Sequence, residues 1–334
     1  MKAFFVSLIM ILISQINMYA QEFKYFDNLD QALKYYHEKR YADAGRAFEL
    51  AFTELKGKST QSNFYNAACA WSLAKNNDKA FFYLQKIIDG KVITGWDDPV
   101  EFYDMLIKDS DFLNITTDPR WTILLQEAER NKTKFLKGIK QELADPIKKM
   151  GVSDQAIRLK LDSVRKISGL NSEAEQAVIT EMKKRDSANF KVFEEIITKY
   201  GWLGPHEIGY KNNQYLFLIL QHADLESQRK YLPLFRKSHK LGRVLPKDLA
   251  YLEDRVNMRD GKMQQYGSQT LIDKNTKKYI LFPVEDVEHV DERRAAVGLE
   301  SLKSYIKSSF NNDFDINKYK EELPELKVKY IKYK

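Results

Sequence analysis

Tyr215-Leu216-Phe217-Leu218-Ile219-Leu220-Gln221-His222-Ala223-Asp224 is the stretch that decides the fold. Its first six residues offer no polar face, so a helix built from them must be packed on all sides. That burial carries the polar end of the helix inward, where Gln221, His222 and Asp224 need partners. A buried polar group without a partner costs about 1 to 3 kcal/mol. We therefore expect a polar site at the end of this helix.

Two helices follow the apolar helix. The first, over residues 225–241, is kinked by Pro233, which cannot donate a backbone hydrogen bond. The second begins at Pro246 and places Asp254 and Arg255 on the side opposite its apolar face.

A hairpin is predicted next. Residues 263–272 and 277–284 have the composition of two strands, and residues 273–276 have that of a turn. Alternation places Gln264, Tyr266 and Ser268 on one face of the first strand, with Gln265, Gly267 and Gln269 on the other.

Helices also precede the apolar helix. Residues 154–158 lie on a short predicted helix capped by Ser153, and a long helix runs from Ser172 to Tyr200. Residues 201–209 form a loop. The predicted fold is therefore mainly α, with N-terminal helix-turn-helix repeats and a helical C-terminal domain containing one β-hairpin.

The N-terminal part of the chain repeats itself. Between Phe26 and Asp89 the apolar pattern returns about 36 positions later, as stacked helix pairs require. The matched residues are Ala32 with Ala68, Tyr35 with Trp71, Ala44 with Ala80, Phe48 with Leu84 and Ala51 with Ile87. The pattern resembles tetratricopeptide repeats, and Trp121 with Leu124 is expected to cap their apolar end. Such arrays hold peptides or partner proteins, or they support the next domain.

The first residues have the form of an export signal. Lys2 precedes an apolar run over residues 4–13, which predicts a signal peptide over residues 1–20 and cleavage between Ala20 and Gln21. The run is shorter than the roughly 20 residues that a membrane span needs. We expect an exported protein, periplasmic or extracellular, with no stable membrane span after cleavage; a membrane anchor is the alternative.

Composition divides the rest of the chain. The predicted parts are a repeat domain over 22–130, a Lys-rich helix or linker over 131–142, a second domain over 143–310 and a basic tail over 311–334. The 54 Lys and Arg residues are spread among 47 Asp and Glu residues, so the net charge of +7 describes a mixed surface. Nucleic acid is therefore not an expected partner.

Several short motifs of the second domain occur together in one family. They are Asp154-Gln155-x-x-Arg158, Gly201-Trp202 with Gly209, Gln221-His222-Ala223-Asp224, Leu249-Ala250-Tyr251-Leu252-x-Asp254-Arg255, Gln264-x-Tyr266-Gly267-Ser268-Gln269 and Asp291-x-x-Arg294 with Gly298-Leu299. The combination resembles the uncharacterised bacterial domain DUF6624 over about half the chain, from Leu143 to Phe310. Ser268 departs from the family, which more often has Thr there, but either hydroxyl donates and accepts. The resemblance implies no reaction, because no activity is assigned to the family.

These motifs predict a polar pocket. A neutral imidazole exchanges protons near neutral pH and a carboxylate can orient it, so the candidate catalytic residues are His222, Asp254 and Asp154. The candidate ligand-binding residues are Gln155, Arg158, Trp202, Gln221, Asp224, Arg255, Gln264, Tyr266 and Gln269. In the alternative interpretation these residues are structural, with Asp224 capping the next helix, Asp254 paired with Arg158 and His222 a satisfied core histidine.

Other chemistries have little support in the sequence. The single cysteine, Cys69, excludes an intrachain disulfide and is expected to be a small buried hydrophobe. The five histidines include no helical pair at metal-ligand spacing. Neither a phosphate-binding glycine loop nor a nucleophile elbow is present. We therefore expect no metal and no cofactor.

Two functions remain. The first is a cell-envelope binding module, in which the second domain binds a small polar ligand and the repeats bind a protein or peptide. The second is a hydrolase-type enzyme with His222 as general base or acid, Asp154 or Asp254 as its carboxylate partner, and Arg255 or Gln269 holding the substrate. The sequence favours binding, because it contains no established catalytic motif.

Overall fold

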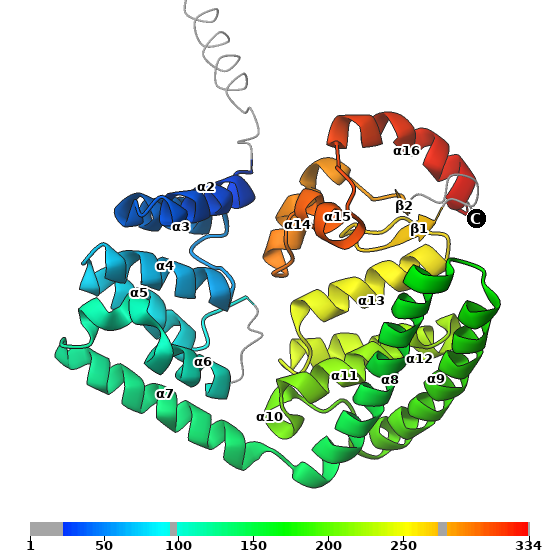
Figure 1. The fold of residues 1–334 in the computed structure, drawn as a ribbon, viewed down its shortest axis with the longest axis horizontal. Helices are drawn as coiled ribbons and strands as arrows, with labels where there is room; N and C mark the ends of the chain where they lie inside the picture. Colours follow the sequence, from blue (N-terminus) through cyan, green and yellow to red (C-terminus); the bar gives the residue numbers. More distant parts are fainter. Residues whose placement is uncertain (1–22, 94–98, 273–278, 333–334) are drawn as a thin grey trace, which may run out of the picture.

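The chain forms two helical lobes joined by one long helix (Figure 1). A computed structural model describes residues 23–93, 99–272 and 279–332. The predicted signal peptide and the predicted hairpin turn at 273–276 lie outside these residues. The regular elements of the described part are helices apart from one two-stranded sheet, which confirms the mainly α prediction. None of the helices in it is both long enough and apolar enough to cross a membrane.

The N-terminal lobe begins with two stacked helix pairs. They are α2 (Tyr25–His37) with α3 (Tyr41–Glu54), and α4 (Gln61–Leu73) with α5 (Asn77–Ile88). Each helix of the second pair begins 36 residues after its counterpart, as the repeated pattern predicts. The small residues of the repeat are fully buried at Ala32, Ala44, Ala51, Ala68 and Ala80. Because these side chains end at Cβ, the helices approach closely, and the tetratricopeptide-like helix pairs are confirmed.

Three further elements close this lobe: α6 (Pro99–Lys108), the 3-10 helix η1 (Ser110–Ile115) and α7 (Pro119–Gly138). Trp121 and Leu124 of α7 are buried in the core of the repeats. The Trp121 ring lies 5.7 Å from that of Phe112 in η1. These residues therefore cover the open end of the stack, as predicted.

The helix α7 continues from the repeats into the second lobe. Phe135, near its end, is buried, and its ring stacks 5.8 Å from that of Tyr210. The segment 131–142, predicted as a helix or linker, is helical up to Gly138, and α8 begins at Gln141. Lys140, between the two helices, donates its backbone N–H to the carbonyl of Glu207 at 2.8 Å. The junction is packed, because Phe135 supplies an apolar anchor among the exposed lysines.

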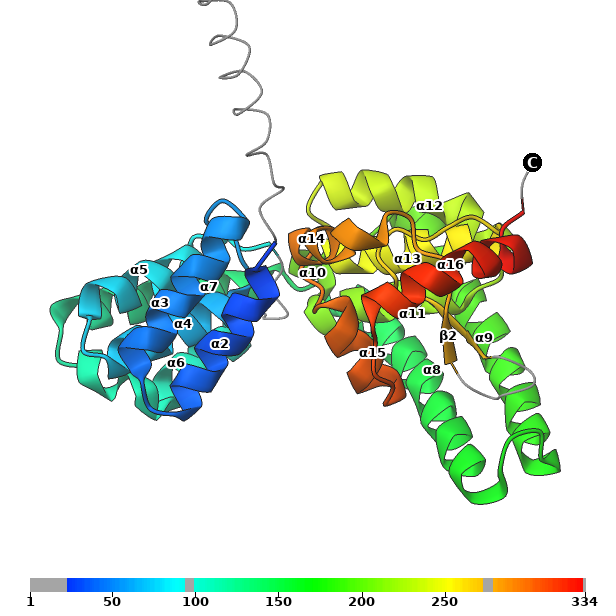
Figure 2. The same ribbon diagram turned by 90° about the horizontal axis from the view of Figure 1, so that it is seen from above.

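The two lobes meet at a second place. Ala295 of α14 (Val290–Ala296) is buried in the core of the repeats. Figure 2 also shows α14 facing the N-terminal lobe. Burial raises the pKa of Asp30 in α2, and the charge of Lys303 from the other lobe opposes that rise. The contact between the lobes is therefore both apolar and electrostatic.

The C-terminal lobe is built on α8 (Gln141–Ser168) and α9 (Glu173–Tyr200), which form a helical hairpin (Figure 2). The start of α9 is as predicted, because the Ser172 side chain accepts from the N–H of Glu175. The short helix predicted over 154–158 is wrong: Ser153 lies inside a helix of 28 residues. Gly151, inside the same helix, gives room to a neighbour, since a Cβ there would lie 2.0 Å from Cγ of Tyr215.

The apolar helix α11 (Tyr210–His222) lies at the centre of this lobe, as predicted. It is covered by α8, α9, the one-turn α10 (Pro205–Ile208), α12 (Leu225–Lys240) and α13 (Pro246–Arg259). The segment 201–209, predicted as a loop, thus contains one helical turn. Trp202 from this segment is 2% exposed, and its ring lies 4.5 Å from that of Phe235.

The remaining elements follow α13 in the chain and lie above it in Figure 1. They are β1 (Thr270–Ile272), β2 (Tyr279–Leu281), the 3-10 helix η2 (Val287–His289), α14, α15 (Leu302–Phe310) and α16 (Ile316–Tyr330). The strands are shorter than predicted, and the basic tail expected beyond residue 311 is in fact helical and packed. Tyr319 of α16 is buried, and its hydroxyl accepts from the N–H of Val284 at 2.9 Å and donates to the carbonyl of Phe282 at 3.1 Å. The apolar side of α16 was hidden by its many lysines.

Gly151→Ala should destabilise the protein, although alanine is the better helix former by about 1 kcal/mol. The new methyl group would overlap the Tyr215 ring and push α8 away from α11. Such overpacking costs about 1 to 3 kcal/mol. Denaturant unfolding followed by circular dichroism measures the loss. The double variant Gly151→Ala/Tyr215→Leu should recover part of it, whereas a single variant as stable as the wild type would contradict this packing.

Candidate functional site

Asp154 of α8 and His222 of α11 are joined by a hydrogen bond in the second lobe. Oδ1 of Asp154 lies 3.0 Å from Nδ1 of His222 and 3.1 Å from Nη1 of Arg158. The other carboxylate oxygen accepts from Nε2 of Gln155 at 2.7 Å. Burial alone would raise the pKa of Asp154, but the hydrogen bond from His222 and the charges around it lower that pKa below its ordinary value. The Asp154 side chain, 1% exposed, is therefore a stabilised carboxylate.

The hydrogen bonds of His222 define its tautomer. Nε of Arg158 lies 3.3 Å from Nε2 of His222 and can only donate. Nε2 must then accept, which leaves the proton on Nδ1, facing Asp154. Both ring nitrogens of this neutral imidazole are engaged.

Arg158 is held by a second carboxylate. Its Nη1 and Nη2 atoms donate to the two oxygens of Asp186 in α9 at 3.1 and 3.2 Å. The expected pairing of Arg158 with Asp254 is wrong. Asp186 was absent from the predicted site, because the register that brings α9 beside Arg158 leaves no signature in sequence spacing. We call Asp154, Arg158, Asp186 and His222 the polar centre.

Two more arginines meet the same end of α11. Nη1 of Arg255 donates to the carbonyl of Gln221 at 3.3 Å, and Nη1 of Arg259 donates to the carbonyl of Ala223 at 2.7 Å. The last carbonyls of a helix lack partners within the helix and carry a partial negative charge. Guanidinium groups from α13 therefore complement the end of α11. Arg255 belonged to the predicted site, whereas Arg259 did not.

Asp224 has the structural role of the alternative interpretation. Its carboxylate accepts from the backbone N–H of Ser227 at 2.8 Å and from the Ser227 hydroxyl at 3.2 Å. These bonds cap the first turn of α12 and lower the pKa of Asp224. The Asp224 side chain is thus held at the N-terminus of α12, where it serves as the N-cap.

Asp254 organises the loop at residues 264–269 and has no hydrogen bond to His222. Its fully buried carboxylate accepts from the backbone N–H groups of Gln265, Tyr266 and Ser268 at 2.7 to 3.1 Å. Burial raises the pKa of Asp254, and these three bonds oppose the rise. The predicted alternation along residues 264–269 is wrong, because the backbone curls around this carboxylate instead of extending as a strand.

The glutamines of this loop are also engaged internally. Nε2 of Gln264 donates to the carbonyls of Gln269 and Phe282, and its Oε1 accepts from the N–H of Gln269. Nε2 of Gln269 donates to the carbonyl of Ser268. Tyr305 of α15 donates its hydroxyl proton to the same Ser268 carbonyl at 2.8 Å. Of the predicted site residues, Asp254, Gln264, Tyr266 and Gln269 thus hold a loop, Trp202 is a core residue, and Asp224 caps α12. The remaining ones gather near the end of α11: Asp154, Gln155, Arg158, Gln221, His222 and Arg255.

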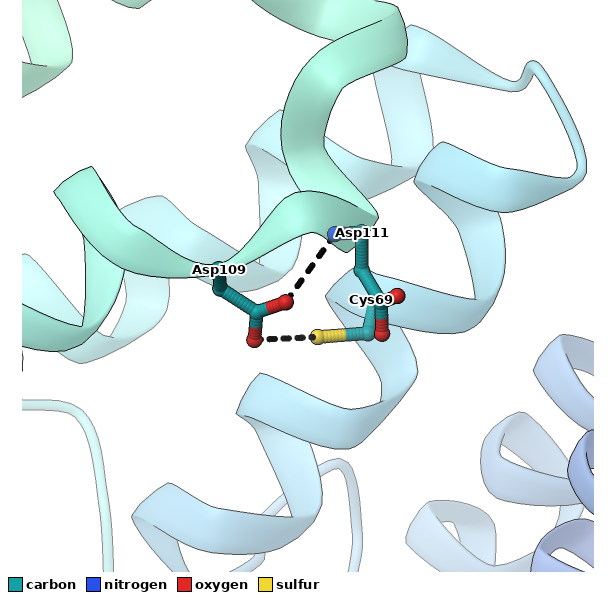
Figure 3. A group of neighbouring side chains, drawn as sticks. All are labelled: Cys69, Asp109 and Asp111. Carbon is teal, nitrogen blue, oxygen red and sulfur yellow. Dashed lines mark hydrogen bonds between the residues drawn. The ribbon is translucent and has the colours of Figure 1, made fainter.

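A separate polar group lies in the N-terminal lobe, where Cys69 faces Asp109 and Asp111 (Figure 3). Sγ of Cys69 donates to Asp109 at 3.8 Å, Tyr65 donates to Asp109 at 2.8 Å, and Tyr36 donates to Asp111. Burial and the two carboxylates raise the pKa of the thiol, which therefore stays protonated. The ligand atoms lie within 4.8 Å of one another, but the hydroxyl and thiol donors account for the group without an ion.

Asp248 was missed by sequence reasoning. It lies in the first turn of α13, where an acidic residue ordinarily faces solvent beside the helix dipole. Here it is 3% exposed, and its enclosed Oδ2 atom has no hydrogen-bond partner among the described residues. Burial raises its pKa to about 7.

Asp248 should make the stability of the protein fall as the pH rises from about 4 to about 7. In this window the folded state keeps a proton on Asp248 that the unfolded chain, with a pKa of 3.8, has released. Asp248→Asn removes the titration and should be more stable than the wild type at pH 8, by up to about 4 kcal/mol. Denaturant unfolding at pH 4, 6 and 8 measures the difference, with the exposed Asp162→Asn as control. A difference independent of pH would contradict the assignment.

These features define the class of protein: a lobe of tetratricopeptide-like helix pairs followed by a helical domain with a buried polar centre. Residues 139–316, more than half the chain, match the model of a family described as "Family of unknown function (DUF6624)". The chain belongs to this family. The matched region begins at the junction after α7 and ends at the start of α16. No curated protein and no solved structure matches the chain.

Proposed function

We propose that the protein is an exported binding module of the cell envelope. In this proposal the C-terminal domain binds a small polar ligand beside the polar centre, and the repeats bind a protein or peptide partner. The supporting observation is the engagement of His222: Asp154 faces its Nδ1 and Arg158 faces its Nε2. A general base needs a lone pair within reach of the proton that it removes. The imidazole offers no such atom in this arrangement.

The hydrolase hypothesis requires Arg158 to leave His222. Its hydrogen bonds to Asp186 and its ion pair with Asp154 oppose that movement. Asp254, the other candidate carboxylate, is occupied by three backbone amides. Fixed polar groups are better suited to recognition, because their side chains need little ordering when a ligand binds.

The polar centre is also within reach of solvent. The side chains of His222, Arg158 and Asp186 are 19%, 22% and 24% exposed, respectively. Asp154, behind them, is 1% exposed. A ligand can therefore touch the outer groups while Asp154 holds them in place.

A hollow in the N-terminal lobe supports the proposed partner site on the repeats. It has a volume of about 680 Å³ and lies between α4 and α6. Its lining combines an aromatic ring, a thioether and charged groups, contributed by Tyr65, Met105, Lys108 and Asp109 among others. Mixed linings of this kind suit a peptide segment with both apolar and polar side chains.

Export predicts that the mature chain begins at Gln21. Intact-mass spectrometry of protein secreted by a host with a signal peptidase measures the start directly. Ile9→Arg, which interrupts the apolar run, should keep the chain inside the cell, whereas Ile167→Arg at an exposed position of α8 should not. A secreted chain that retains residues 1–20 would contradict cleavage.

The ligand site is tested by His222→Asn and Asp154→Asn. Asparagine at position 222 can still donate to Asp154, so the melting temperature of His222→Asn should fall by no more than about 2 °C, equivalent to about 1 kcal/mol in a chain of this size. Thermal shifts of the wild type are measured against a library of sugars, peptides and nucleotides. Compounds that stabilise the wild type should lose their effect on both variants.

The matched control is His239→Asn. His239 lies on α12, and its Nδ1 atom is 3.1 Å from the Val244 carbonyl, away from the polar centre. This variant should keep every ligand response. Equal responses in all three variants would exclude the polar centre as the binding site, and consumption of a hit compound by the wild type would favour the hydrolase alternative.

A further inference from the structure

Arg255 is an arginine without a counter-ion among the described residues. Its one hydrogen bond among the described residues is the 3.3 Å contact of Nη1 with the Gln221 carbonyl. No carboxylate of the described residues forms an ion pair with Arg255. Its Nε atom is enclosed and has no hydrogen-bond partner among the same residues. Burial and the charges of Arg259 and Arg158 lower its pKa to about 10, still high enough for the guanidinium to be charged at neutral pH.

Gln221, beside Arg255, has an unsatisfied hydrogen-bond acceptor. This residue is 6% exposed, and its Oε1 atom is enclosed without a partner among the described residues. A donor on Arg255 and an acceptor on Gln221 are therefore both unsatisfied, on residues that already touch through the Gln221 carbonyl. Each such buried group costs about 1 to 3 kcal/mol.

The other arginines nearby do not share this state. Arg158 has the carboxylates of Asp154 and Asp186. Arg259 donates to both the Ala223 carbonyl and Oε1 of Gln228. Arg294 also has an unpartnered nitrogen, but it is completely buried, whereas Arg255 is partly exposed and can be reached from solvent.

We infer that Arg255 binds an anionic group of the ligand, a carboxylate or a phosphate, and that Gln221 Oε1 accepts a hydrogen bond from a hydroxyl or N–H group beside it. This inference rests on the proposed ligand site and names the chemical class that the site selects. Guanidinium groups recognise both anions through paired N–H donors. Since no carboxylate of the described residues pairs with Arg255, its guanidinium can pair with an anion of the ligand, and the charges of Arg158 and Arg259 add to the attraction.

The experiment titrates the mature chain, from Gln21 to Lys334, with small probes at constant ionic strength. Glycolate carries a carboxylate and a neighbouring hydroxyl, acetate lacks the hydroxyl, glycolamide lacks the charge, and inorganic phosphate tests the other anion. Calorimetry gives the affinities, and the Nε–H signals of the arginines in nitrogen-15 spectra report contact. Glycolate or phosphate should move the Arg255 signal and glycolamide should not, with glycolate binding at least threefold more tightly than acetate.

Matched variants separate the two groups. Arg255→Gln should weaken glycolate and phosphate at least tenfold, and Gln221→Leu should remove the preference for glycolate over acetate. Arg236→Gln is the control, because Arg236 is an exposed arginine of α12 paired with Glu253. It should leave all affinities unchanged. If Arg255→Gln fails to fold, Arg255→Lys replaces it in the experiment. Lysine keeps the positive charge but lacks the paired N–H donors of the guanidinium, so this variant should bind glycolate with at least threefold lower affinity.

The outcomes distinguish this inference from the function on which it rests. In one outcome, neutral library compounds bind in a way that depends on His222 but not on Arg255, and no anion binds. This outcome would overturn the anion assignment and leave the polar ligand site intact. An Arg255 signal that stays fixed at saturating glycolate and phosphate would likewise overturn it. A wild type that binds neither anions nor any library compound would overturn both.

Discussion

The C-terminal lobe depends on the burial of the apolar stretch of α11 over residues 215–220, which has no polar face. Because α11 is enclosed by its neighbours, its last turn is largely withdrawn from solvent. The carbonyl groups and side chains there lose water and must find protein partners. Arginines from α8 and α13 supply them, and Asp154 and Asp186 in turn balance Arg158. The polar centre is thus the consequence of an apolar segment.

The sequence was most informative where one local pattern dominated. The spacing of small residues gave the helix pairs of the first lobe, and the unbroken apolar run gave α11. The proximity of His222 to Asp154 followed from placing a polar helix end in a core. Each of these inferences uses neighbours along the chain or the burial of a single helix.

Other features depended on contacts that sequence spacing does not encode. The register of α8 against α9 brings Asp186 to Arg158. The ring of Tyr215 packs so closely on α8 that position 151 has no room for a side chain. Residues 264–269 have the composition of a strand, yet three of their backbone N–H groups donate to the carboxylate of Asp254. Several hydrogen bonds to one buried carboxylate outweigh strand propensity. The lysines of the last segment likewise concealed the anchoring role of Tyr319.

The long helix α7 is anchored in both lobes and so couples their relative positions. Trp121 near its start is fixed in one core, and Phe135 near its end stacks against Tyr210 of the other lobe. Fourteen residues of helix separate these anchors by about 21 Å. If α7 tilts as a straight rod, a tilt of about 5° displaces the far anchor by about 2 Å over that length. The contact of Ala295 with the first core completes a closed loop of packed elements, so such a tilt must also shift α14. A change in the angle between α7 and either lobe therefore requires a change at the α14 contact as well.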